Sequence, residues 1–244
     1  MIRQETLSGT SWRFYYDENT FPPGTDTFLL SSFPVLKPGA RVCDLGAGSG
    51  LLGLLLLRRE RTLSVTGVEL NGGDCRLAER SIRESGLDGQ FRVLNADLRA
   101  PEALPRAGSF DLAVCNPPYF SPGSGASAAG AARRNSRSEE SCSLSDICRA
   151  AARLVRWGGR FCLVYRPERL CDLLSTLRGA GLEPKRLRFV ENTAGGAPLL
   201  VLAEGRRGGR PGLAVEPPLI LCGPDGGPAA ELDAIYFRNT EERS

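Results

Sequence analysis

Between residues 41 and 50 the chain reads Arg41-Val42-Cys43-Asp44-Leu45-Gly46-Ala47-Gly48-Ser49-Gly50, an apolar run followed by alternating glycines. The apolar part predicts a buried strand, and the leucine-rich segment 51–59 predicts a helix. Glycines between a strand and a helix let the backbone approach a ligand closely, with amide hydrogens presented near the helix N-terminus. We therefore predict a nucleotide-type binding loop in a sheet whose strands alternate with helices.

The glycine spacing alone leaves two cofactors open. Gly48, Gly50 and Gly53 satisfy the Gly-x-Gly-x-x-Gly pattern of dinucleotide-binding enzymes. The preceding Asp44-Leu45-Gly46 instead favours S-adenosylmethionine (SAM), which has no pyrophosphate to cradle. A dinucleotide-dependent oxidoreductase is the alternative from a different enzyme class.

Two further predicted strands carry acidic residues at their carboxyl ends. The strand over 64–70 places Glu69 where a carboxylate can accept both hydroxyls of a ribose. The strand over 91–95 is followed by Asp97 and Leu98, and Asp97 can accept a hydrogen bond from an adenine amino group. Because ligands bind at the carboxyl edge of such sheets, these side chains predict a composite site. The simpler interpretation is a surface acid or a helix cap.

The motif Cys115-Asn116-Pro117-Pro118-Tyr119-Phe120 follows a fourth apolar strand, predicted over 110–114. Two consecutive prolines prevent a strand or helix from continuing. The resulting loop suits a planar substrate with an amino group. Asn116 and the Pro117 carbonyl can each accept one amino hydrogen, while Tyr119 stacks on the ring. The nitrogen lone pair then turns towards an electrophile, and no general base is required. A rigid turn without catalytic function is the alternative.

Composition narrows the choice of partners and compartment. Of the 244 residues, 41% are hydrophobic and 24% are charged, which predicts one α/β domain with additions. The net charge of +3 permits an anionic partner without requiring one. The sequence shows neither an apolar run that could cross a bilayer nor a signal-peptide core, so we expect a cytoplasmic protein without a membrane partner. The oligomeric state is left open, with a monomer favoured.

The chain has no histidine and eight cysteines. Without imidazole, Ser-His and Cys-His hydrolases and any histidine general base are excluded. The cysteines show no Cys-x-x-Cys spacing, so we expect no metal site.

The remaining segments extend this core at both ends. We predict an N-terminal extension or lid over 1–36 and a main domain over 37–244. In the extension, Thr25 or Asp26 can cap a helix. Further strands are predicted over 159–166, 183–191, 198–203 and 213–222, and further helices over 74–85 with Asp74 as cap, 144–154 and 167–178.

Two basic segments predict a nucleic-acid surface beside the catalytic motif. Segment 121–141 is a loop without apolar periodicity, and segment 205–212 reads as a basic turn. Basic loops commonly contact phosphates, although a solvated surface loop is the alternative. The arginines concerned are Arg133, Arg134 and Arg137 in the first segment and Arg206, Arg207 and Arg210 in the second.

These motifs resemble those of the class I SAM-dependent methyltransferases, and in particular the family that N6-methylates adenine 37 of a valine tRNA. The similar stretches are Gly24-Thr25-Asp26 with Leu29-Leu30, the loop 44–50, Asn116-Pro117-Pro118-Tyr119, Arg137-Ser138-Glu139, 165–170, 218–220 and 235–236. Ser138 replaces a family histidine, and Gly227-Pro228-Ala229 departs from an aromatic-containing pattern.

The resemblance implies a doubly wound, Rossmann-like α/β sheet with an antiparallel strand near one edge, an N-terminal strand and helix, and an added C-terminal strand. It implies catalysis by Asn116, Pro117 and Tyr119, and tRNA as partner through its anticodon loop. The expected SAM-binding residues are Thr25, Asp26, Asp44, Gly46, Gly48, Gly50, Glu69, Asp97, Leu98 and Asn116. The expected RNA-binding residues are Arg133, Arg134, Arg137, Arg206 and Arg207.

Other acceptors use similar chemistry. A glutamine amide in a release factor is one, although those enzymes resemble a core preceded by a longer helical domain. An rRNA guanine-N2 or a DNA adenine is another, and a DNA enzyme would usually carry an added base-reading domain. A catalytically inactive binding module is disfavoured because the four catalytic residues are intact.

Overall fold

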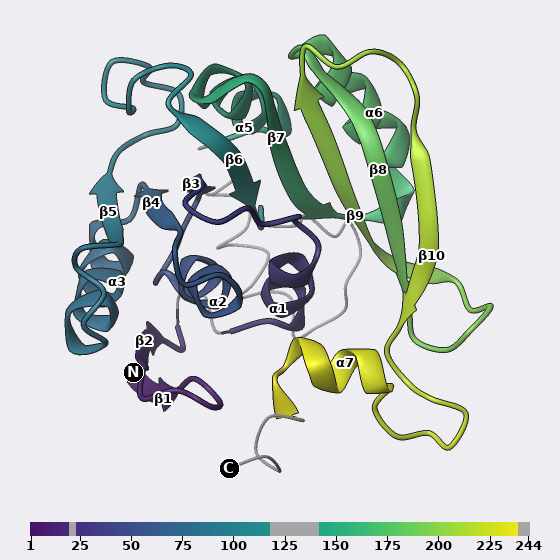
Figure 1. Cartoon of the computed structure of the whole chain (residues 1–244), viewed down its shortest axis with the longest axis horizontal. Coiled ribbons are helices and arrows are strands. Elements are labelled where there is room, and N and C mark those ends of the chain that lie inside the picture. Colours follow the sequence, from purple (N-terminus) through teal and green to yellow (C-terminus); the bar gives the residue numbers. More distant parts are fainter. Residues whose placement is uncertain (20–22, 118–141, 239–244) are drawn as a thin grey trace.

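The computed structural model describes residues 1–19, 23–117 and 142–238, and an eight-stranded sheet forms their centre (Figure 1). Across the sheet the strands follow the order β10-β8-β9-β7-β6-β3-β4-β5. Their bounds are β3 (Arg41–Leu45), β4 (Ser64–Glu69), β5 (Phe91–Asn95), β6 (Phe110–Cys115), β7 (Val155–Tyr165), β8 (Leu182–Glu191), β9 (Pro198–Arg207) and β10 (Ala214–Ile220).

Strand direction places the carboxyl ends of the central strands at one edge. Strand β9 pairs antiparallel with β7 and β8, whereas the other neighbours in this sheet pair in parallel. Figure 1 shows the arrow of β9 pointing against those of β6 and β7. The predicted doubly wound sheet, with its antiparallel strand near one edge and an added C-terminal strand, is confirmed. The ends of β3, β4, β5 and β6 therefore share an edge, here called the carboxyl edge.

Helices cover both faces of the sheet because alternate strand residues point to opposite sides. Val42 and Leu112 belong to a core that includes α1 and α2, whereas Cys43 and Ala113 belong to a second core with α5 and α6. The helices are α1 (Thr25–Ser32), α2 (Leu51–Arg59), α3 (Gly72–Glu84), α5 (Leu144–Leu154), α6 (Leu170–Gly179) and α7 (Ala230–Ile235).

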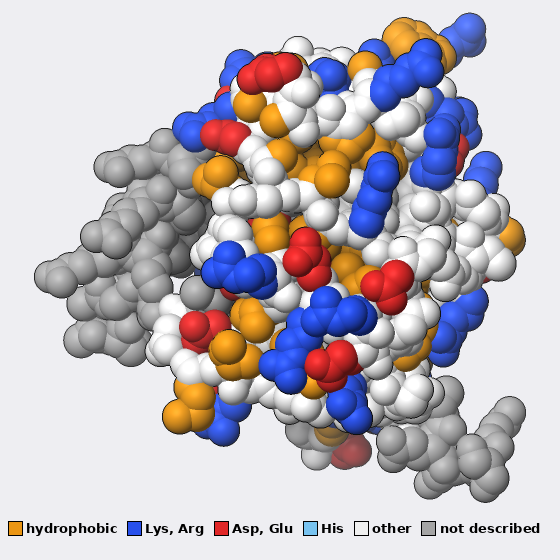
Figure 2. Space-filling view, turned by 90° about the vertical axis from the view of Figure 1, so that its left-hand side faces the viewer, with side chains coloured by type: hydrophobic (Ala, Val, Ile, Leu, Met, Phe, Trp, Pro, Cys, Tyr) orange, Lys and Arg blue, Asp and Glu red, His pale blue; other side chains and the backbone are white. Residues whose placement is uncertain are grey.

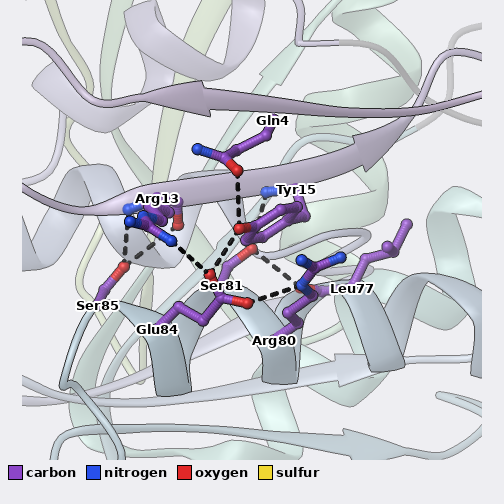
Figure 3. A network of polar contacts seen from close by, with 8 residues as sticks. All are labelled: Gln4, Arg13, Tyr15, Leu77, Arg80, Ser81, Glu84 and Ser85. Atoms are coloured by element: carbon purple, nitrogen blue, oxygen red, sulfur yellow. Dashed lines mark hydrogen bonds and ion pairs between the residues drawn. The ribbon is translucent and has the colours of Figure 1, made fainter.

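The N-terminal hairpin, β1 (Ile2–Thr6) with β2 (Arg13–Asp17), forms its own sheet and is fastened to α3 (Figure 3). The Tyr15 backbone N–H donates to Ser81 Oγ at 2.9 Å, and the Tyr15 hydroxyl donates to Glu84 Oε2 at 2.6 Å. Arg13 and Arg80 also pair with Glu84. Hydrogen bonds from Arg80, and then from Tyr15 and Arg13, lower the pKa of Glu84 to about 2. These contacts attach the N-terminal extension to α3 of the main domain. The boundary of the extension at residue 36 stays a prediction.

Some predicted element ends and caps are wrong. Gly24, not Thr25 or Asp26, is the N-cap of α1, because the helix begins at Thr25 itself. Helix α3 begins at Gly72, where the Asn71 side chain accepts from the backbone of Gly73 and Asp74. The expected turn over 205–212 is wrong in its first part, because β9 continues to Arg207. A 3-10 turn over Pro167–Arg169 precedes α6.

Gly53 lets a large ring pack directly against α2. A Cβ at Gly53 would lie 2.4 Å from Cζ of Phe91, a buried residue of β5. The third glycine of the dinucleotide-like pattern therefore serves helix-to-sheet packing in this chain.

We predict that Gly53→Ala lowers the free energy of unfolding by about 1 to 3 kcal/mol, because the added methyl group overpacks the core. Gly179→Ala is the matched control. Gly179 also lies in a helix, but no atom lies within 4 Å of its Cβ position. That variant should be neutral or more stable by up to about 1 kcal/mol. Urea denaturation measures both, and equal stabilities would contradict the packing role.

Candidate active site

The glycine loop after β3 is held in a conformation that leaves open space above it. Gly46, Gly48 and Gly50 have φ values of 70°, 53° and 88°, a region that strongly favours glycine. The Gly46 and Ala47 backbone N–H groups both donate to the Val68 carbonyl, at 2.9 and 3.1 Å. No atom lies within 4 Å of a Cβ placed on Gly46 or Gly48. A ligand can therefore lie against the backbone there.

Glu69 at the end of β4 faces this loop. Its Oε2 accepts from Gly48 N–H and its Oε1 from Asn71 N–H, both at 2.8 Å. Burial raises the pKa of Glu69, and these backbone hydrogen bonds oppose that rise. Each carboxylate oxygen can accept a second hydrogen bond. The pair of hydroxyls on a ribose fits this carboxylate.

Asp44 lies beneath the loop with an unsatisfied oxygen. The residue is 1% exposed, and its Oδ2 has no hydrogen-bond partner in the described part of the chain. Burial, followed by the negative charge of Glu69, raises the pKa of Asp44 to about 7. An unpaired buried carboxylate is unfavourable, and a nearby cation relieves that cost. A ligand with positive charge, as SAM has, suits the site.

Asn116 follows β6 and is bonded to the N-terminal helix. Its Nδ2 donates to Thr27 Oγ1 of α1 at 2.9 Å. Thr27 is buried, and so is Pro117. The bond directs the amide nitrogen towards α1 and the side-chain oxygen away from that helix. Two residues distant in sequence thus meet at the carboxyl edge.

Sequence reasoning missed Thr27 as a functional residue. It lies one residue after Asp26, on a helix whose neighbouring positions Leu29 and Leu30 are fully buried. The available signal was a hydroxyl on the core-facing side of a predicted helix. A buried hydroxyl requires a partner, which the sequence alone did not identify.

The other residues predicted to bind the cofactor lie near the same edge and differ in their contacts. Asp97 forms a bidentate pair with Arg99, at 3.0 Å from Nε to Oδ1 and 2.7 Å from Nη2 to Oδ2. The hydrogen bonds from Arg99 lower the pKa of Asp97. Leu98 packs against the second core, Thr25 is exposed, and Asp26 is half-buried at the start of α1. A role for Asp97 towards adenine stays a prediction and requires it to share or release Arg99.

Of the predicted RNA-binding arginines, the two that the structure describes lie away from the catalytic motif. Tyr119, Arg133, Arg134 and Arg137 lie outside the described residues. Strand β9 ends with Arg206 and Arg207. In the backbone ladder, Arg206 lies opposite Arg160, the first residue of β7 that pairs with β9. The expectation that they lie beside the catalytic motif is wrong, because β9 runs antiparallel and ends at the opposite edge of the sheet.

The described residues hold neither a cluster of metal ligands nor a membrane-spanning helix. No group of three or more His, Cys, Asp or Glu side chains there could hold a metal ion. Among the described helices, none has the length and apolar character needed to span a bilayer.

Comparison with known proteins identifies the family. Residues 16–174 match the methyltransferase small domain. A tRNA1(Val) (adenine(37)-N6)-methyltransferase of Tolumonas auensis is 31% identical over 198 residues, covering 80% of this chain and 81% of that protein. A protein of the same name from Cronobacter sakazakii is 33% identical over 189 residues, covering 77% and 76%.

A solved structure supports the fold. The chain superposes on a predicted O-methyltransferase from Agrobacterium tumefaciens with a TM-score of 0.70, at 23% identity, covering 87% of this chain and 95% of that one. At this identity the likeness concerns the fold alone. The family match and the two relatives show that the chain belongs to the methyltransferase small domain family and, within it, to the tRNA1(Val) (adenine(37)-N6)-methyltransferase family.

Proposed function

We propose that the protein transfers the methyl group of SAM to the N6 amino group of an adenine in tRNA, at position 37 of a valine tRNA. The observation that carries this proposal is the position of Asn116 at the end of β6, next to the strand that leads into the glycine loop. The names of the relatives supply the acceptor. The dinucleotide alternative is set aside, since the chain belongs to a methyltransferase family.

The residues present fit SAM as cofactor. Gly46 and Gly48 would lie against it, Glu69 would accept its ribose hydroxyls, and Asp44 would face its positive charge. Bound there, SAM supplies an electrophilic methyl group. Asp97 and Leu98 would lie beside its adenine, and Thr25, Asp26 and Gly50 are also proposed to line its site.

The catalytic residues act by holding the acceptor nitrogen. The Asn116 side-chain oxygen accepts one hydrogen of the adenine amino group, and the Pro117 carbonyl accepts the other. Tyr119 is proposed to stack on the ring. With both hydrogens held, the lone pair points towards the methyl group, and the methylated nitrogen then releases its proton to water. The bond from Asn116 Nδ2 to Thr27 holds the amide nitrogen towards α1 and leaves the side-chain oxygen for the adenine amino group.

The acceptor adenine is proposed to lie in the anticodon loop. An unpaired base can leave its stack at low cost, which suits a site that must enclose it. Arg133, Arg134 and Arg137, which follow the catalytic motif in the sequence, are proposed to contact the phosphates around it. A cytoplasmic, monomeric enzyme is part of the same proposal.

Glu69→Ala should weaken the binding of SAM and of its demethylated product tenfold or more, because charge-assisted hydrogen bonds of about 1.5 to 3 kcal/mol each are lost. Glu69→Gln, which keeps an acceptor, should be milder. Glu79→Ala, an exposed acid on α3, is the control. Calorimetric titration measures all three, and an unchanged affinity in Glu69→Ala would rule out the ribose assignment.

Asn116→Ala should lower kcat at least about a hundredfold while SAM affinity changes less than about threefold, because the amide acts on the transition state. Single-turnover methylation of tRNA and SAM titration separate the two effects. Equal damage to both would indicate a structural turn.

Thr27→Val should lower kcat about tenfold or more, because the isosteric side chain no longer accepts from Asn116 and the amide loses its fixed orientation. Thr27→Ser keeps the hydroxyl and should restore most of the rate, with SAM affinity and melting temperature near wild type. If Val and Ser behave alike, the hydrogen bond does not orient Asn116.

A further inference from the structure

A bulge in β7 exposes a tryptophan at the edge opposite to Asn116. Between the pairs Phe110–Val155 and Leu112–Arg160, two steps along β6 correspond to five along β7. The extra residues project from the ladder, which is how bulges re-aim side chains. Trp157 in this bulge is 74% exposed, the most of any large hydrophobic side chain in the described ranges. So exposed an indole suggests a binding role.

Trp157 is fixed against a glycine rather than free in solvent. A Cβ at Gly208 would lie 2.2 Å from Cζ2 of Trp157, so the indole rests directly on the backbone after β9. Arg207 braces this turn, since its Nη1 donates to the Val155 carbonyl at 2.6 Å. The exposed part of the ring is therefore a held aromatic platform.

Two arginines without an ion pair in the described part of the chain flank in sequence the Gly208 on which the indole rests. The side chains of Arg206 and Arg210 are exposed and form no ion pair within the described residues. A Cβ at Gly158 would lie 3.6 Å from Nη2 of Arg206, which places that guanidinium next to the bulge. A hollow of about 510 Å³ borders the platform. Its one acidic lining residue, Glu183, is engaged by Arg178 at 2.7 Å.

The face that carries α3 differs in charge. Figure 2 shows basic and acidic side chains interspersed over that side of the molecule. Several are paired there, as Arg13 and Arg80 are with Glu84. Helix α3 itself carries three acidic and three basic side chains.

We propose that Trp157, Arg206 and Arg210 form a second RNA-docking surface, which takes an unpaired nucleotide of the substrate tRNA away from the anticodon loop. An aromatic ring for the base and arginines for the phosphates are the usual pairing in single-strand recognition, and they favour RNA over an acidic protein. This inference rests on the proposed function for the identity of the RNA. It keeps an RNA role for Arg206, at a different place from the one the sequence suggested.

The position of the surface sets a length requirement on the RNA. The surface lies at the amino end of β6, whereas Asn116 follows its carboxyl end. The six residues of β6 span about 20 Å. A duplex covers that distance in roughly six base pairs at about 3.4 Å each. A short stem-loop with fewer pairs reaches the catalytic edge alone, whereas a full tRNA reaches both places.

The test compares Trp157→Ala, Trp157→Phe and the double variant Arg206→Ala/Arg210→Ala on full tRNA and on a four-base-pair anticodon stem-loop. Trp157→Ala and the double variant should each lower tRNA affinity about tenfold. Both should methylate the stem-loop like wild type. Trp157→Phe, which keeps an aromatic ring, should bind tRNA within about twofold. Arg76→Ala/Arg83→Ala, exposed arginines on α3, is the matched control and should change neither substrate.

Two physical readouts accompany these affinities. The double variant should reduce the log–log salt slope of tRNA binding by about 1.4 to 1.8, for two lost phosphate contacts. Full tRNA should quench tryptophan fluorescence in wild type but hardly in Trp157→Phe, because the remaining Trp12 is buried.

The proposal is overturned by variants that bind tRNA like wild type, by equal losses on tRNA and stem-loop, or by quenching that persists in Trp157→Phe. Quenching by polyglutamate but not by tRNA would instead assign the surface to an acidic protein. A wild-type protein that methylates no RNA would refute the proposed function. The tRNA affinities and the fluorescence quenching would still show whether Trp157, Arg206 and Arg210 bind RNA.

Discussion

The hydrogen bond from Gly48 N–H to Glu69 joins the ends of β3 and β4, and the cofactor edge depends on it. The glycine loop is further held by the two donors to the Val68 carbonyl, so its shape is fixed from the neighbouring strand. The same contacts keep the half-buried Glu69 carboxylate at the loop, and the buried Asp44 lies beneath it. The site therefore carries negative charge that a cationic cofactor offsets, which is a physical reason for SAM at this edge.

The N-terminal helix belongs to the site as much as the sheet does. Leu29 and Leu30 of α1 are fully buried, which fixes the helix on the core, and Thr27 then reaches Asn116. The helix thereby orients the amide on which the proposed chemistry relies. The hairpin before it is anchored separately, through Tyr15 and Glu84, to α3.

The sequence predicted the central strands well, because strong local signals specify them. Apolar runs followed by glycine or an acid predicted the bounds of β3, β4 and β5 to within one residue. The parallel direction of these strands follows from their alternation with helices.

Other features depend on contacts that local pattern does not encode. Gly72 and Gly73 disfavour a helix, so the start of α3 at the Asn71 cap was missed. The strand predicted over 159–166 begins at Val155 instead, because a bulge precedes its regular part. The reversal of β9 is a matter of topology, and it carried Arg206 and Arg207 to the far edge. The Thr27 partner of Asn116 lies 89 residues away in sequence.

The central claim is that this edge methylates the N6 atom of an adenine in tRNA. The most direct measurement is mass spectrometry of nucleosides from unmodified valine tRNA incubated with the protein and isotopically labelled SAM. We expect labelled N6-methyladenosine, mapped to position 37 and absent when Asn116→Ala replaces the wild type. Label in another nucleoside, in glutamine of an added release factor, or in no product would contradict it.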